Sequence, residues 1–170
     1  MSEPQIQIVT ENDEPLKAAD KKDAYTNGWF HRMARVMLED ADGRVLLQKR
    51  AEHMEMYPGR WDNSAAGYVD VGEDYITAAL RELNEEIGIK DVKLRTLGYY
   101  ESRSKFDWRL LNRFNRVYRL VVSPNIKFKL EAKEVAHVQW FTVAEARQLI
   151  VDHPDLVTDG LAEVMKRFYK

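Results

Sequence analysis

Apolar residues recur along the chain with two periods, and this pattern predicts its main strands and helices. Alternating apolar residues bounded by turn-forming residues predict strands at 31–38, 44–48, 92–100, 113–122 and 135–141. The first two strands are joined across Asp42-Gly43, a dipeptide typical of tight turns. A stripe at helical spacing predicts a helix that packs on a core, and it consists of Ile76, Leu80, Leu83 and Ile87.

Three further segments carry helix signals. Residues 21–27 predict a short helix that ends near Gly28, and residues 155–169 predict a final helix. Residues 142–145 have the form of a capping box that opens a helix. Strands that alternate with helices predict an α/β or α+β fold, and 170 residues are enough for one domain with a hydrophobic core.

The first 30 residues differ from the rest of the chain. Residues 1–24 are polar apart from an apolar alternation at Ile6, Ile8 and Val9, and a turn follows at 12–15. We expect residues 1–30 to form an arm or hairpin packed on the domain, and residues 31–170 to form the domain itself. Such an arm is compatible with a homodimer.

Composition excludes several kinds of chemistry. The chain has 26 Lys and Arg against 28 Asp and Glu, so its net charge of −2 gives no general attraction to nucleic acid or to anionic membranes. It has no cysteine, which excludes disulfides, cysteine-ligated metal sites and a thiol nucleophile. No apolar run reaches the ~18–20 residues of a membrane span. Since the N-terminus also lacks the features of a secretory signal, we expect a cytoplasmic protein.

Residues 67–89 combine a glycine, an arginine and several carboxylates at fixed spacing. Helical geometry places Glu82, Glu85 and Glu86 together, away from the apolar stripe. Three carboxylates repel one another there, and a hard cation such as Mg²⁺, which prefers carboxylate and phosphate oxygens, relieves the repulsion. The alternative is the charged outer face of an ordinary amphipathic helix. Arg81 is expected to project away from the Glu82 and Glu86 side and to pair with Glu73.

This segment resembles the signature of the Nudix hydrolase superfamily, G-x5-E-x7-R-E-U-x-E-E-x-G-U, where U is aliphatic. Every fixed position matches, from Gly67 to Ile89. The resemblance implies an α/β/α sandwich with a mixed β-sheet and dependence on Mg²⁺ or Mn²⁺. It also implies hydrolysis of a nucleoside diphosphate linked to another moiety, or of a related small-molecule diphosphate.

Segments 31–32, 43–50 and 58–64 are similar to one Nudix branch, isopentenyl-diphosphate isomerase. That branch carries a cysteine and a histidine where this chain has Ala66 and Tyr68, and it carries an acidic pair in a later strand that is absent here. Moving a double bond needs one group that protonates carbon and another that deprotonates it. We therefore expect pyrophosphohydrolase machinery on an isomerase-like fold. An isomerase-like enzyme and a non-catalytic ligand-binding Nudix module remain as alternatives.

The expected site follows from the motif. We expect Glu82, Glu85 and Glu86 to bind the metal, together with the backbone carbonyl of Gly67. Glu85 and Glu134 are the candidates for the base that takes a proton from water. The cations expected to bind substrate are Lys49, Arg50 and Arg60, drawn from a wider pool that includes Arg109 and Arg113. Two further expectations concern possible structural roles: His31 as a hydrogen-bonded strand residue, and a solvated sheet face made of Arg109, Arg113 and Arg116.

Overall fold

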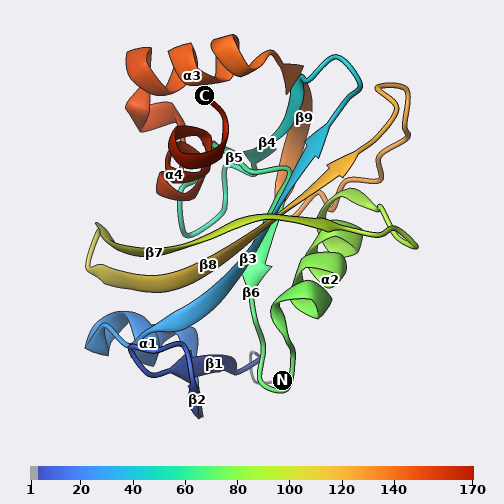
Figure 1. Cartoon of the computed structure of the whole chain (residues 1–170). Coiled ribbons are helices and arrows are strands. Elements are labelled where there is room, and N and C mark those ends of the chain that lie inside the picture. Colours follow the sequence, from blue (N-terminus) through green and yellow to red (C-terminus); the bar gives the residue numbers. More distant parts are fainter. Residues whose placement is uncertain (1–3) are drawn as a thin grey trace.

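A mixed β-sheet of nine strands forms the body of the protein in the computed structural model, which describes residues 4–170 (Figure 1). The strands are β1 Ile6–Val9, β2 Pro15–Ala19, β3 His31–Glu39, β4 Val45–Arg50, β5 Trp61–Asp62, β6 Ala65–Tyr68, β7 Arg95–Phe106, β8 Arg109–Val121 and β9 Val135–Phe141. The helices are α1 Lys21–Asn27, α2 Tyr75–Ile87, α3 Val143–Asp152 and α4 Asp159–Phe168, with a 3-10 turn at Pro154–Leu156. The predicted mixed α+β class is confirmed.

Strand β3 organises the sheet because it pairs with several neighbours. It runs parallel to β8 over its whole length and antiparallel to β6 from Met33 to Val36. Only Leu38 and Glu39 of β3 pair with β4, which otherwise pairs with β9 and β5. The sheet therefore divides beside β6, and the residues around this division form the site described below.

Helices cover both faces of the sheet, and the alternation along β3 explains how (Figure 1). Ala34, Val36 and Leu38 share a core with Leu83 and Ile87 of α2. Met37 points to the other face, into a second core formed by α3 and α4, because neighbouring residues in a strand face opposite sides. The result is the three-layered α/β/α arrangement that the resemblance implied.

Most predicted elements are confirmed, and the exceptions have physical reasons. Helix α1 and strand β9 have the predicted bounds, and Gly28 ends α1 in the left-handed conformation at φ +63°. The hairpin β7–β8 is longer than predicted, since exposed polar residues between 101 and 112 hide its alternation. The last helix begins at Asp159 rather than 155, because Thr158 caps it by accepting a hydrogen bond from the Leu161 amide.

The N-terminal residues form the antiparallel hairpin β1–β2. Ile8 of β1 pairs with His31 at the start of β3, and Ile6 forms a bridge with Asp70. The hairpin thus extends the main sheet, while the proposed division of the chain at residue 30 stays a prediction, and residues 1–3 lie outside the described part. Over residues 4–170 no helix is long and apolar enough to cross a membrane.

Candidate active site

A cavity of about 340 Å³ lies where the sheet divides, between the middle of α2 and the start of α4. Carboxylates from five elements or loops and cations from five elements line its wall. These charged residues are Lys21, Arg35, Arg50, Asp62, Asp70, Arg81, Glu82, Glu85, Glu86, Arg113, Glu134 and Asp159. The structure therefore brings the four predicted glutamates, Gly67 and Arg81 to one hollow.

Gly67 is required by the close approach of α2 to β6. A Cβ atom on Gly67 would lie 2.0 Å from Oε1 of Glu82, so no larger residue fits while Glu82 keeps its position. Asp74 caps the start of helix α2, since its side chain accepts a hydrogen bond from the Thr77 amide, and Gly88, which has φ +76°, caps its end. These local signals fix the helix that carries the glutamates relative to β6.

The three motif glutamates have different environments. Glu86 is buried and accepts hydrogen bonds from the Gln48 side chain and, at 3.4 Å, from the Ala66 amide. The Glu82 side chain is 12% exposed, whereas that of Glu85 is 52% exposed. The motif face is therefore not a uniform charged surface: two of its carboxylates are enclosed.

Burial changes the acidity of the two enclosed carboxyls. It raises the pKa of Glu82 to about 7, although the positive charge of Arg81 opposes the shift. Burial also raises the pKa of Glu86 well above its ordinary value, and the neighbouring charge of Glu82 adds to the effect. The charge of Glu134 raises both pKa values further, which places Glu134 within electrostatic reach of the pair.

Arg81 is the centre of an ion-pair network. Its Nε lies 2.7 Å from Oε1 of Glu73 and its Nη2 lies 2.9 Å from Oε2, so the predicted pairing with Glu73 is confirmed. The expectation that Arg81 projects away from the glutamates was wrong. Its Nη1 lies 2.6 Å from Glu82 and 3.3 Å from Glu85, because the guanidinium fork can bind several carboxylates at once.

Only one of the three predicted substrate-binding cations lines the cavity. Arg50 does, and it donates to the Met56 carbonyl at 3.0 Å and lies 3.4 Å from Asp62. Lys49 does not, because it follows Gln48 in β4 and so faces the other side, where its ammonium lies over the Trp61 ring. Arg60 is also outside the lining.

Arg60 is held by aromatic rings and backbone. Its guanidinium lies 5.2 Å from the centre of the Tyr57 ring and donates to the Val157 carbonyl at 3.4 Å. Its position in the turn after Gly59 therefore directs it to the base of α4, away from the glutamates.

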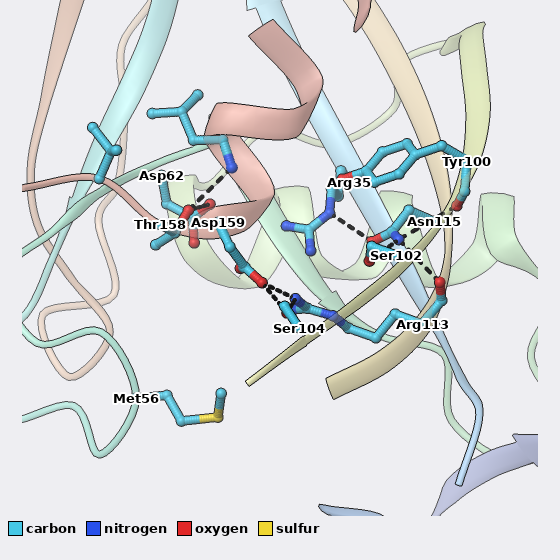
Figure 2. Close-up of polar contacts among 12 residues, drawn as sticks. Arg35, Met56, Asp62, Tyr100, Ser102, Ser104, Arg113, Asn115, Thr158 and Asp159 are labelled. Atoms are coloured by element: carbon cyan, nitrogen blue, oxygen red, sulfur yellow. Dashed lines mark hydrogen bonds and ion pairs between the residues drawn. The ribbon is translucent and has the colours of Figure 1, made fainter. Parts of the chain in front are cut away.

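Two buried arginines complete the cavity wall (Figure 2). Arg113 forms an ion pair with Asp159 and donates to Ser104 at 3.1 Å; it is buried, so the alternative of a solvated sheet face was wrong for this residue. Arg35 was not among the site residues predicted from the sequence. A charged residue inside the apolar run of β3 could have indicated it, because a buried charge needs a partner.

His31 has the structural role that was expected. It is fully buried in β3, and its Nδ1 lies 3.2 Å from the Trp29 carbonyl oxygen. Burial lowers its pKa to about 3, and the positive charge of Arg113 lowers it further. The ring is therefore neutral throughout the physiological range.

The fold and the glutamate helix define a Nudix enzyme, and the chain belongs to this family: the NUDIX domain model matches residues 29–168. It is a hydrolase that acts on pyrophosphate bonds. An uncharacterized Nudix hydrolase of Pseudomonas aeruginosa is 33% identical over 150 residues, 85% of this chain and 84% of that protein. An isopentenyl-diphosphate Δ-isomerase of Aliivibrio fischeri is 27% identical over 168 residues, covering 95% and 93% of the two chains.

Solved structures show the same fold. A crystal structure from Deinococcus radiodurans superposes with a TM-score of 0.83 at 22% identity, over 98% of this chain and 99% of that one. The Nudix domain of Shewanella oneidensis NrtR, solved with ADP ribose, superposes with a TM-score of 0.59 at 20% identity, over 81% and 86%. Nudix proteins generally use a divalent metal, and the carboxylates around this cavity are the donors that such an ion takes.

Proposed function

We propose that this chain is a Mg²⁺-dependent pyrophosphohydrolase whose ion is held by Glu82, Glu85, Glu86 and the carbonyl of Gly67. The observation that supports this most strongly is the pair of enclosed carboxylates, Glu82 and Glu86, whose pKa values are raised by burial and by neighbouring carboxylates. Enclosing two neighbouring carboxylates is costly unless a cation compensates them. Mn²⁺ has similar ligand preferences and can replace Mg²⁺.

The donor set fits a hard cation after one exchange of contacts. Among residues 4–170 no three His, Asp or Glu side chains already surround one point in the manner of a formed metal site. Instead, the Glu82 and Glu85 carboxylates form ion pairs with Arg81. An ion would take these two carboxylates from Arg81, which keeps its two bonds to Glu73.

The reaction we propose is attack of water on a phosphorus atom of a small-molecule diphosphate. The bound ion supplies positive charge that offsets the charge of the diphosphate and of the attacking oxygen. Glu134 and Glu85 both line the cavity, and either can accept the proton from water. Arg81 positions the carboxylates and the loop at Glu73, and Arg50 lies where it can contact phosphate oxygens.

The alternative of an isomerase is disfavoured by the residues of this cavity. Ala66 and Tyr68 supply no thiol and no imidazole, and the low pKa of His31 removes it as an acid. The positive charge of Arg113 near His31 also opposes binding of a metal there.

A substrate screen with matched variants tests the proposal. We expect phosphate or nucleotide release from at least one member of a panel of organic diphosphates, only in the presence of Mg²⁺ or Mn²⁺, and a loss of at least 100-fold in Glu86→Gln. Isopentenyl diphosphate should not be converted to its isomer. Isomerase activity of the wild type, or full hydrolysis by Glu86→Gln, would exclude the assignment.

A further inference from the structure

Arg35 is a buried cation that has only neutral partners. It is 2% exposed, its Nε donates to Oδ1 of Asn115 at 2.9 Å, and its Nη1 donates to Oδ1 of Asn63 at 3.1 Å. Within residues 4–170 no carboxylate lies within 4 Å of its guanidinium, and its Nη2 donates no hydrogen bond. A buried charge without a counter-ion is costly, so this arginine calls for an anion.

The surroundings of Arg35 favour an anion. The second guanidinium, that of Arg113, faces the same space in Figure 2, as does the first turn of α4. The N-terminal end of a helix carries partial positive charge. A Cβ atom on Gly160 would lie 2.2 Å from Nη1 of Arg35, so glycine allows α4 to approach the guanidinium.

The charge balance of this end of the cavity is positive. Asp159 pairs with Arg113, and Asp62 pairs with Arg50, which leaves the charge of Arg35 in excess. Asp159 is itself kept ionised, since the charges of Arg113 and Arg35 lower its pKa in spite of burial. The existing carboxylates therefore do not neutralise the site.

Arg35 lies close to the proposed metal site. It is the direct partner of Ala66 in the antiparallel β3–β6 pair, and the Ala66 amide is the one that contacts Glu86. Directly opposite residues in such a pair have Cβ atoms roughly 4.5–5.5 Å apart. Neighbouring phosphoryl groups of one substrate can thus reach the glutamates and Arg35 together.

The two sides of the cavity differ in size. On the Arg35 side its wall is formed by β3, β8 and the start of α4, and the Arg113–Asp159 ion pair stands between it and a smaller hollow of about 330 Å³. On the other side it adjoins a hollow of about 770 Å³, which shares several residues with it. This hollow is lined by the aromatic and apolar side chains of Tyr25, Met54, Met56, Tyr68 and Trp108 and by charged residues of both signs. A small anionic end of a substrate fits the first side, and a bulky organic moiety fits the second.

We propose that Arg35 and Arg113 bind the terminal phosphoryl group of the substrate, so that the enzyme prefers organic molecules that end in a diphosphate or triphosphate. Molecules in which a diphosphate joins two organic moieties are poor substrates, because their second moiety meets the enclosed side. This inference rests on the proposed function. In the reaction the water oxygen bonds to phosphorus, the bridging P–O bond breaks with its electron pair leaving on the departing phosphate, and a cavity carboxylate takes the proton.

The test compares free and capped diphosphates on the wild-type protein. Nucleoside 5′-diphosphates of the four bases are assayed beside the corresponding nucleoside diphosphate riboses, with Mg²⁺. We expect kcat/KM to be at least 10-fold higher for a free diphosphate than for its capped counterpart. Equal or faster hydrolysis of capped substrates, abolished by Glu86→Gln, would overturn this inference and leave the proposed function intact. Hydrolysis of neither set, with hydrolysis of another member of the wider diphosphate panel, would overturn this inference alone; hydrolysis of no diphosphate at all would overturn both.

A binding measurement on an Arg35 variant distinguishes a role in binding phosphate from a role in stabilising the fold. Inorganic pyrophosphate in EDTA should raise the melting temperature of the wild type. Arg35→Gln should remove this rise and increase KM for free diphosphates at least 10-fold, while capped substrates change little. Arg119→Gln is the matched control, since Arg119 pairs with Glu39 on a half-exposed part of β8 outside the cavity. Pyrophosphate protection that is absent from the wild type, or equal in the wild type and Arg35→Gln, would refute the assignment.

Discussion

Replacing Glu82 by glutamine should stabilise the metal-free protein while it abolishes activity. Glutamine has the shape of a protonated glutamate, so the substitution removes the charge and keeps the packing. Burial raises the pKa of Glu82 from its ordinary 4.5 to about 7, and ionising it in the folded state therefore costs about 3 kcal/mol at pH 8. Its side chain is only 12% exposed, so solvent screens little of this cost.

The effect has a defined dependence on pH. The folded-state pKa lies above the unfolded-state value, so the unfolded protein loses its proton first as pH rises. The wild type therefore loses stability between about pH 4.5 and pH 7, and Glu82→Gln does not. The two proteins should match near pH 4. At pH 8 the variant should melt roughly 6–12 °C higher, from the usual 2–4 °C per kcal/mol in a chain of this size.

Thermal and urea unfolding in EDTA from pH 4 to pH 8 measures this difference. Glu85→Gln is the control: Glu85 is half-exposed, so its replacement should change the free energy of unfolding little. Both variants should lose Mg²⁺-dependent hydrolysis. If Glu82→Gln is no more stable than the wild type at pH 8, the ionised Glu82 carboxylate does not destabilise the folded protein. The electrostatic argument for a bound cation is then refuted.

Three further outcomes are expected. Gly67→Ala should displace the Glu82 carboxylate, since its Cβ would lie 2.0 Å from Oε1, and should lower activity at least 10-fold with an unchanged circular dichroism spectrum; full activity would contradict the close approach. The rise in melting temperature caused by Mg²⁺ should grow from pH 5.5 to pH 8, because the ion binds the ionised form of Glu82, whose pKa is about 7; a constant rise would argue against this ligand. Glu134→Gln should lower kcat roughly 10²-fold or more with little change in KM if Glu134 takes the proton, whereas an unchanged kcat assigns that role to Glu85.

The sequence was sufficient for the parts of the site that depend on local structure. Glu82, Glu85 and Glu86 lie within two turns of one helix, whose apolar stripe and terminal Gly88 are readable without a fold. Gly67 was recognised by its spacing, although the reason for a glycine there, the approach of α2, appears only in three dimensions. Strand limits in the β7–β8 hairpin were less accurate because polar residues are frequent on its exposed face.

The cations were predicted poorly because their positions depend on long-range packing. Lys49 and Arg60 were expected to bind substrate, but strand alternation and the turn after Gly59 direct them away from the cavity. Arg35 and Arg113 are 78 positions apart in the sequence. They line the same cavity because β3 and β8 pair in parallel. No local pattern encodes that pairing.

The two sets of buried charge around β6 explain why metal and substrate should bind cooperatively. Glu82 and Glu86 need positive charge, and Arg35 needs negative charge, yet in the folded protein they do not pair with each other. A cation at the glutamates neutralises charge that would repel a phosphate, and a phosphate at Arg35 adds oxygen ligands beside the glutamates. Each ligand therefore removes part of the cost of binding the other, and by linkage the gain in affinity is the same in both directions. Pyrophosphate is thus expected to bind at Arg35 without the ion, and to bind more tightly when the ion is present.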